Sequence, residues 1–207
     1  MDNQLKEIFG AWLAVIGTVT SAVGSTPSLF IKKDLRNDLN LWGNVLQGVG
    51  NAVMADGQGE WSLETIGNEL QSVGNITVIA GLVIDFEDEI QQRLIIDGNW
   101  IQALGGVTAL GNELEDTLDK NEIYNIIGNL LQAIGNSLQA LSGAYELKAS
   151  SYNRVEKSNQ DENNESLDVI GSWIQAIGSV ISLIGQIHEE SEEQNNEDEK
   201  NQTSKNY

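Results

Sequence analysis

Six segments of the chain share one pattern of apolar and polar positions. Each begins on a glycine, carries Leu or Ile three residues later and Ile, Val or Leu six residues later, and reaches a second glycine after seven. The first glycines are Gly10, Gly43, Gly67, Gly98, Gly128 and Gly171, and the second are Gly17, Gly50, Gly74, Gly105, Gly135 and Gly178. Four copies continue to a third glycine at the same interval: Gly24, Gly57, Gly81 and Gly185. Six copies without gaps identify an internal repeat.

The interval of seven predicts helices. Seven residues make two helical turns, so the glycines of one copy lie almost above one another, with the two aliphatic residues to one side. This is a heptad with glycine at an a-like position and Leu or Ile at d. Five copies carry Gln at the fourth position after the first glycine: Gln47, Gln71, Gln102, Gln132 and Gln175. The alternative, a Gly-Asn turn between short strands, is weaker because the aliphatic residues do not alternate.

The repeat glycines are predicted to be helix-packing residues. Each glycine inside a helix costs about 1 kcal/mol relative to alanine. Close approach of two helices offsets that cost, because a missing Cβ lets their backbones come near each other. We expect the neighbouring glutamines to hydrogen-bond across the same contact.

The pattern predicts an all-α fold of about six helices, packed as a bundle or a helical-repeat array. The expected helices span about residues 4–24, 34–54, 62–85, 87–114, 120–150 and 167–188. Pro27 follows the first helix, a turn cluster at residues 56–59 ends the second, and Ser62 is a suitable N-cap for the third. A polar linker at residues 153–166 precedes the last helix. We expect one helical domain, residues 1–188, and a disordered acidic tail, residues 189–207.

Charged residues are absent from long stretches of the expected helices. Residues 8–31, 123–145 and 169–187 contain none. Helices that are apolar nearly all round must be buried in a bundle, in an oligomer or against lipid. The first stretch is long enough for a signal peptide or a membrane span, but the segment before it lacks a positive n-region. A helix of the bundle core is favoured, and both alternatives remain open.

Charge and composition exclude several partners. The net charge of −20 argues against nucleic acid, because no basic stripe is present to contact phosphates. It also argues against electrostatic capture by anionic membranes, but not against hydrophobic insertion. The chain has no cysteine, so it has no disulfide and no thiolate metal site.

No catalytic, cofactor or metal site is predicted, and no small-molecule substrate is evident. His188, the one histidine, falls at the end of the last helix without a nucleophile context. The acidic cluster at residues 85–89 suits a joint between helices, and the acidic tail matches no Ca²⁺ loop. Trp12, Trp100 and Trp173 share one repeat position, where they could flank a packed contact or anchor at a membrane interface.

The segments Leu5-Lys6-Glu7-Ile8-Phe9-Gly10-Ala11-Trp12 and Gly171-Ser172-Trp173-Ile174-Gln175-Ala176-Ile177-Gly178 are the most distinctive parts of the repeat. With the glycine spacing, they resemble an uncharacterised family of glycine-repeat "repetitive proteins" from Bacillus-type bacteria. The resemblance covers about residues 5–186. It implies a bacterial source and supplies no activity or site.

Two functions fit these observations, and an enzyme is not expected. The leading hypothesis is a non-catalytic structural or interaction protein whose glycine contacts pack helices within the chain and between chains, as in a homo-oligomer. The alternative is a membrane-active protein that inserts uncharged helical hairpins, either as a pore or peripherally. A cytoplasmic location is expected, with membrane association and secretion left open.

Overall fold

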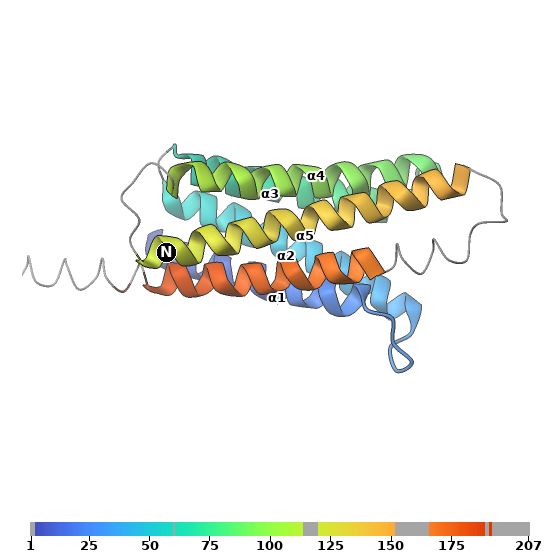
Figure 1. The fold of residues 1–207 in the computed structure, drawn as a ribbon, viewed down its shortest axis with the longest axis horizontal. Helices are drawn as coiled ribbons and strands as arrows, with labels where there is room; N and C mark the ends of the chain where they lie inside the picture. The colour runs from blue at the N-terminus through green and yellow to red at the C-terminus, as the bar shows by residue number, and fades with distance from the viewer. Residues whose placement is uncertain (1–2, 60, 114–119, 152–165, 189–190, 192–207) are drawn as a thin grey trace, which may run out of the picture.

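The computed structural model describes residues 3–59, 61–113, 120–151, 166–188 and 191, and over these residues the fold is all-α. Its helices are α1 (Asn3–Ser25), α2 (Lys33–Gln58), α3 (Leu63–Val83), α4 (Asp88–Glu113) and α5 (Lys120–Ser151), followed by Ser166–His188, here named the C-terminal helix (Figure 1). The predicted all-α bundle is confirmed. The predicted linker and tail lie outside the described residues, apart from Ser166 and Ser191, so the expectation of a disordered tail stays a prediction.

Local sequence signals explain where the helices begin and end. Ser62 caps α3, because its hydroxyl oxygen accepts a hydrogen bond from the backbone N–H of Thr65 at 3.0 Å. The second helix runs one turn further than the predicted end at residue 54. It includes Gly57, which packs against Glu7 of α1, and it stops at Gly59, whose φ of 66° is a left-handed conformation.

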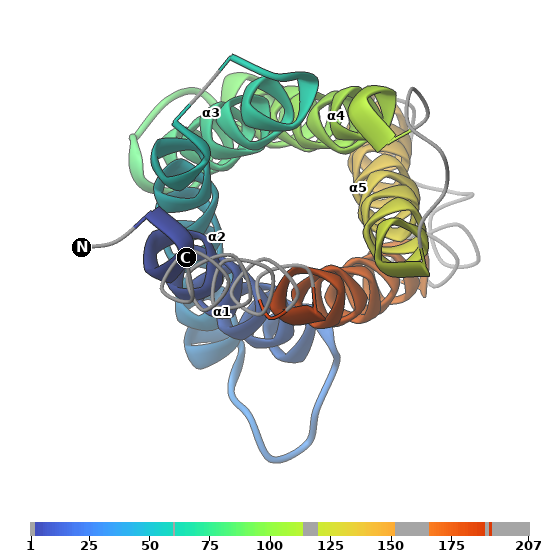
Figure 2. The ribbon, with the colours of Figure 1, turned by 90° about the vertical axis from the view of Figure 1, so that its left-hand side faces the viewer.

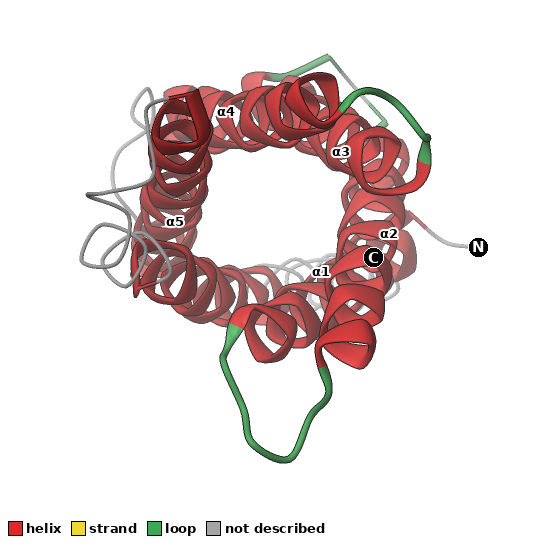
Figure 3. Ribbon diagram, turned by 90° about the vertical axis from the view of Figure 1, so that its right-hand side faces the viewer, coloured by secondary structure: helices red, strands yellow, loops and turns green. Residues whose placement is uncertain are grey.

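The helices run alternately up and down and form a closed ring, which Figures 2 and 3 show from its two ends. Neighbours along the chain contact each other from α1 to α5. The C-terminal helix packs on α5 and closes the ring against α1, where the hydroxyl groups of Thr18 and Ser179 lie 2.6 Å apart. The ring therefore consists of three antiparallel hairpins: α1–α2, α3–α4 and α5 with the C-terminal helix.

The alternating directions give the ring two distinct ends. The first, here the Asn3 end, holds the starts of α1, α3 and α5. The second, here the Ser25 end, holds the starts of α2, α4 and the C-terminal helix, together with the loop between α1 and α2 (Figure 1). Each repeat lies in the middle part of one helix, so the six repeats lie at about the same height along the axis of the ring.

Candidate functional site

Glycines of the repeat join the two helices of each hairpin. A Cβ on Gly17 would lie 2.7 Å from the carbonyl oxygen of Gly43, and one on Gly43 would lie 2.8 Å from the carbonyl oxygen of Gly17. The same reciprocal contact occurs twice in every hairpin: Gly10–Gly50 and Gly17–Gly43, Gly67–Gly105 and Gly74–Gly98, Gly128–Gly178 and Gly135–Gly171. Real Cβ atoms do not approach other atoms this closely, so these positions exclude any side chain without a shift of the backbone.

The third glycines also face the partner helix, but they meet other residues there. A Cβ on Gly24 would contact Asn40 and the carbonyl oxygen of Arg36, and one on Gly81 would lie 2.8 Å from the carbonyl oxygen of Gln91. Gly185 lies against Asn125 of α5. The close approach thus extends beyond the paired glycines toward the ends of the hairpins.

The interior of the ring is polar. The five glutamines of the repeat, Gln47, Gln71, Gln102, Gln132 and Gln175, are each at most 7% exposed. We name these five residues the glutamine layer, because one shared repeat position, between the paired glycines, places them at one level of the bundle. The first repeat has Ala14 at this position, and Ala14 is buried too.

Gln175 connects all three hairpins. Its Nε2 donates to Oε1 of Gln47 at 2.8 Å and, more weakly, to Oε1 of Gln102 at 3.4 Å. Its own Oε1 accepts from Nε2 of Gln139 at 3.0 Å. That last bond crosses its own hairpin, and two other glutamines do the same, as Gln47 donates to Ser21 and Gln132 donates to Ser182. The layer therefore holds the hairpins to one another as well as bonding within them.

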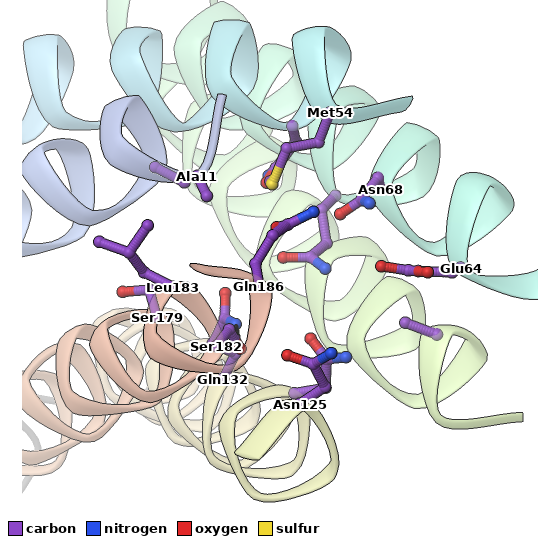
Figure 4. Close-up of a pocket in the computed structure, with 15 residues that line it drawn as sticks. Ala11, Met54, Glu64, Asn68, Asn125, Gln132, Ser179, Ser182, Leu183 and Gln186 are labelled. Carbon is purple, nitrogen blue, oxygen red and sulfur yellow. Dashed lines mark hydrogen bonds between the residues drawn. The ribbon is translucent and has the colours of Figure 1, made fainter. Parts of the chain in front are cut away.

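A small cavity lies against the glutamine layer on its Asn3 side. Its volume is about 40 Å³, and residues of all six helices line it. Gln71 and Gln132 of the layer face it, together with the amide side chains Asn51, Asn68, Asn125, Asn129 and Gln186 (Figure 4). Among the described residues of the lining, Glu64 is the only ionisable one.

Other buried amides and hydroxyls follow two further repeat positions that the sequence analysis did not single out. At the first and eighth residues after the glycine, the buried polar residues are Thr18, Asn51, Asn68, Asn75, Asn99, Asn136, Ser172 and Ser179. Positions one, four and eight lie on one side of a helix, beside the glycines. Their signal in the sequence is that Asn, Gln, Ser and Thr recur at the same repeat positions in most copies.

Five buried side-chain amide atoms have no hydrogen-bond partner among the described residues. They are Nε2 of Gln58, Nε2 of Gln102, Oδ1 of Asn75 and both side-chain amide atoms of Asn136. Asn75 and Asn136 are fully buried. Such groups are costly to leave unsatisfied, and ordered water is their usual partner in proteins.

The outer surface is apolar. The aliphatic residue at the sixth repeat position is between 42% and 56% exposed in every copy: Ile16, Val49, Val73, Leu104, Ile134 and Ile177. The aliphatic residue at the third position is partly buried in all six copies. The aliphatic residues of the heptad therefore cover the ring instead of filling it.

The tryptophans lie on this outer surface as well. Trp12, Trp100 and Trp173, which share one repeat position, are exposed, and Trp173 donates its Nε1–H to Thr26 Oγ1 at 3.0 Å near the Ser25 end. By length and composition, α1 and the neighbouring C-terminal helix are each apolar enough to cross a membrane. These two helices adjoin where the ring closes, so they present one continuous apolar face.

The chain matches a known protein family over most of its length. The model of a family of unknown function, DUF6944, matches residues 5–183. The chain belongs to this family. No curated protein and no solved structure matches it. The match to DUF6944 runs from α1 into the C-terminal helix and includes all six repeats.

The other candidate groups considered from the sequence remain outside the polar interior. His188 lies at the end of the C-terminal helix, where its ring makes a T-shaped contact with the ring of Tyr124. The acidic cluster at residues 85–89 runs into the first turn of α4, where Glu89 pairs with Arg93 one turn later. Within the described ranges, no three His, Cys, Asp or Glu side chains gather as a metal site would require.

Proposed function

We propose that the protein is a non-catalytic membrane protein that inserts as a ring of three helical hairpins around a polar interior. The observation that carries the proposal is the reversed polarity of the ring, with Gln and Asn inside and Leu, Ile and Val outside. A protein folded in water keeps its exposed apolar patches small, whereas here they recur on every helix. Lipid is the solvent for which this surface is suited.

The dimensions of the helices support the proposal. The shortest described helix, α3, has 21 residues. At 1.5 Å per residue it spans about 32 Å, which matches the hydrocarbon core of a bilayer at about 30 Å. Trp61, exposed in the connection between α2 and α3, then lies near the membrane interface, where the indole ring is favoured.

The packing within the ring is also of the kind found between helices in lipid. Lipid tails are as apolar as leucine side chains, so helices in a bilayer associate through close contact of small residues and through interhelical hydrogen bonds. The paired glycines provide the close contact. The bonds from Gln175 to Gln47 and from Gln132 to Ser182 provide the polar links.

Flotation with liposomes tests the proposal directly. The full chain is mixed with phosphatidylcholine vesicles or reconstituted from detergent, and it is then centrifuged through a density gradient after a carbonate or urea wash. We expect the protein to float with the vesicles and to resist the wash. A protein that stays at the bottom of the gradient at both neutral and acid pH contradicts membrane insertion.

One observation favours a second function, that of a soluble structural or interaction protein that self-associates. Glu69 and Asp97 are exposed on the α3–α4 hairpin, each about two turns from the nearer end of its helix. A carboxylate at the centre of a membrane helix costs about 3 kcal/mol, which disfavours lipid on this side of the ring. In water the apolar surface would then be covered by further copies. Light scattering without detergent would give a defined oligomer mass under this second function.

The proposed membrane function bears on the cellular location, and the sequence bears on the source organism. A membrane location is proposed in place of the cytoplasmic one expected from the sequence. The support for it is the apolar face shared by α1 and the C-terminal helix. The glycine-repeat resemblance further supports a Bacillus-type bacterial source.

A further inference from the structure

The glutamine layer and the adjoining cavity form one column of hydrogen-bonding groups inside the ring, and apart from Glu64 these are uncharged amides and hydroxyls. Gln71 and Gln132 belong to both, so the cavity ends at the layer (Figure 4). Toward the Ser25 end, buried polar residues continue beyond the layer at Asn99 and Ser172. Among the described residues, every buried polar side chain is Ser, Thr, Asn or Gln.

The size of the cavity suits water. Its volume is about 40 Å³. On this measure a cavity of about 10–15 Å³ is enough for one water molecule, which needs two to four polar partners to be held in a protein. The amide groups of Asn51, Asn68 and Asn129 supply such partners.

The glutamine layer provides little for a cation. The Oε1 atoms of Gln47 and Gln102 both accept from Gln175, and Oε1 of Gln175 accepts from Gln139. Among the fully buried amide atoms of the layer, the one without a partner is a donor, Nε2 of Gln102. An N–H donor binds the oxygen of a water molecule and repels a cation.

Anions are disfavoured by charge. The chain carries a net charge of −20, and among the described residues that line the cavity none is basic and Glu64 alone is ionisable. Removing an ion from water costs several kcal/mol when no opposite charge compensates for it. A water molecule, in contrast, exchanges its hydrogen bonds for equivalent bonds to the amide groups.

We infer that this column is a path for water that excludes ions, with the glutamine layer as its narrowest point. The inference rests on the proposed membrane insertion. Water would pass the layer by replacing the amide–amide bonds of Gln175 one at a time. The weakest of these, the 3.4 Å bond to Gln102, lies beside the unpartnered donor.

Osmotic shrinkage of proteoliposomes tests the path. The full chain is reconstituted into phosphatidylcholine vesicles, and the shrinkage rate is followed by stopped-flow light scattering after a sucrose jump. We expect shrinkage several-fold faster than in empty vesicles, while imposed K⁺ and Cl⁻ gradients persist. Shrinkage at the rate of empty vesicles, or collapse of either ion gradient, overturns the inference.

A matched pair of variants locates the narrowest point. Gln102→Leu removes the unpartnered donor and an acceptor of the layer, and it should return the shrinkage rate toward that of empty vesicles. Gln92→Leu, the same change on the same helix about three turns away, should leave the rate unchanged. Equal rates in the two variants would show that the layer does not limit the flow. If Gln102→Leu does not insert, Gln175→Leu replaces it, and the unmodified chain decides the main question by itself.

Flotation of the same vesicles separates this inference from the proposed function. An inserted chain that does not pass water overturns the water path and leaves membrane insertion standing. A chain that fails to float with the vesicles overturns both.

Discussion

At Gly135 the backbone of α5 lies directly against the C-terminal helix. A Cβ there would be 2.5 Å from the carbonyl oxygen of Gly171 and 2.6 Å from the backbone nitrogen of Gln175. Both atoms belong to main chain, which cannot rotate away as a side chain can. The absence of a side chain at this position is therefore a condition for the contact between the two helices.

Gly135→Ala is expected to destabilise the ring by about 1–3 kcal/mol, the usual cost of overpacking, even though alanine favours the helix. Gly111→Ala is the control, because a Cβ at Gly111 would meet only the side chain of Leu63, which can move. Unfolding of the two variants in the same detergent, followed by circular dichroism, gives the comparison. Equal stability would show that the helices can separate slightly at no cost.

The same glycines show how far the sequence could predict individual residues. Their interval of seven predicts a shared helix face, and the structure pairs Gly17 with Gly43 and Gly135 with Gly171. Periodicity does not state which face of a helix points inward. The heptad placed the aliphatic residues of the third and sixth positions together on one side of the glycines, yet those at the sixth position, such as Ile16 and Ile177, are on the outside. The choice depends on the surrounding solvent, which a single sequence does not specify.

The helices themselves were largely predictable, because local chemistry determines where they stop. Charge clusters and turn residues separate six long apolar segments, and the observed ends lie within a few residues of the expected ones. The largest difference is the end of α2, where Gly57 stays helical because it packs on Glu7. That contact joins residues about fifty positions apart, so local signals do not contain it.

The N-cap of α3 provides a test at this scale. Ser62→Ala removes the acceptor of the Thr65 N–H and should destabilise the protein by about 1 kcal/mol. Ser62→Asp keeps an acceptor at the same place and should remain close to the unmodified chain. Amide hydrogen exchange at the first turn of α3 measures the local effect. Faster exchange in both variants, or in neither, would contradict a capping role.

The ring as a whole has an uneven distribution of basic residues, and this bears on its orientation in a membrane. Among the described residues, Lys32, Lys33, Arg36, Arg93 and Lys148 lie toward the Ser25 end, whereas Lys6 and Lys120 lie toward the Asn3 end. Short loops rich in Lys and Arg stay on the cytoplasmic side, and acidic residues contribute little to this preference. Because α1 begins and the C-terminal helix ends at the Asn3 end, residues 3 and 188 lie on the same side of the membrane.

We therefore expect the Ser25 end to face the cytoplasm and the Asn3 end to face outward. The chain has no cysteine, so a single introduced thiol reports one position without background. Leu29 and Trp61 are strongly exposed in the connections at opposite ends, which makes Leu29→Cys and Trp61→Cys a matched pair. A membrane-impermeant maleimide added to intact cells should label Trp61→Cys, and it should label Leu29→Cys only after permeabilisation. The reverse pattern would contradict the orientation, and labelling of both thiols in intact cells would contradict a ring that crosses the membrane.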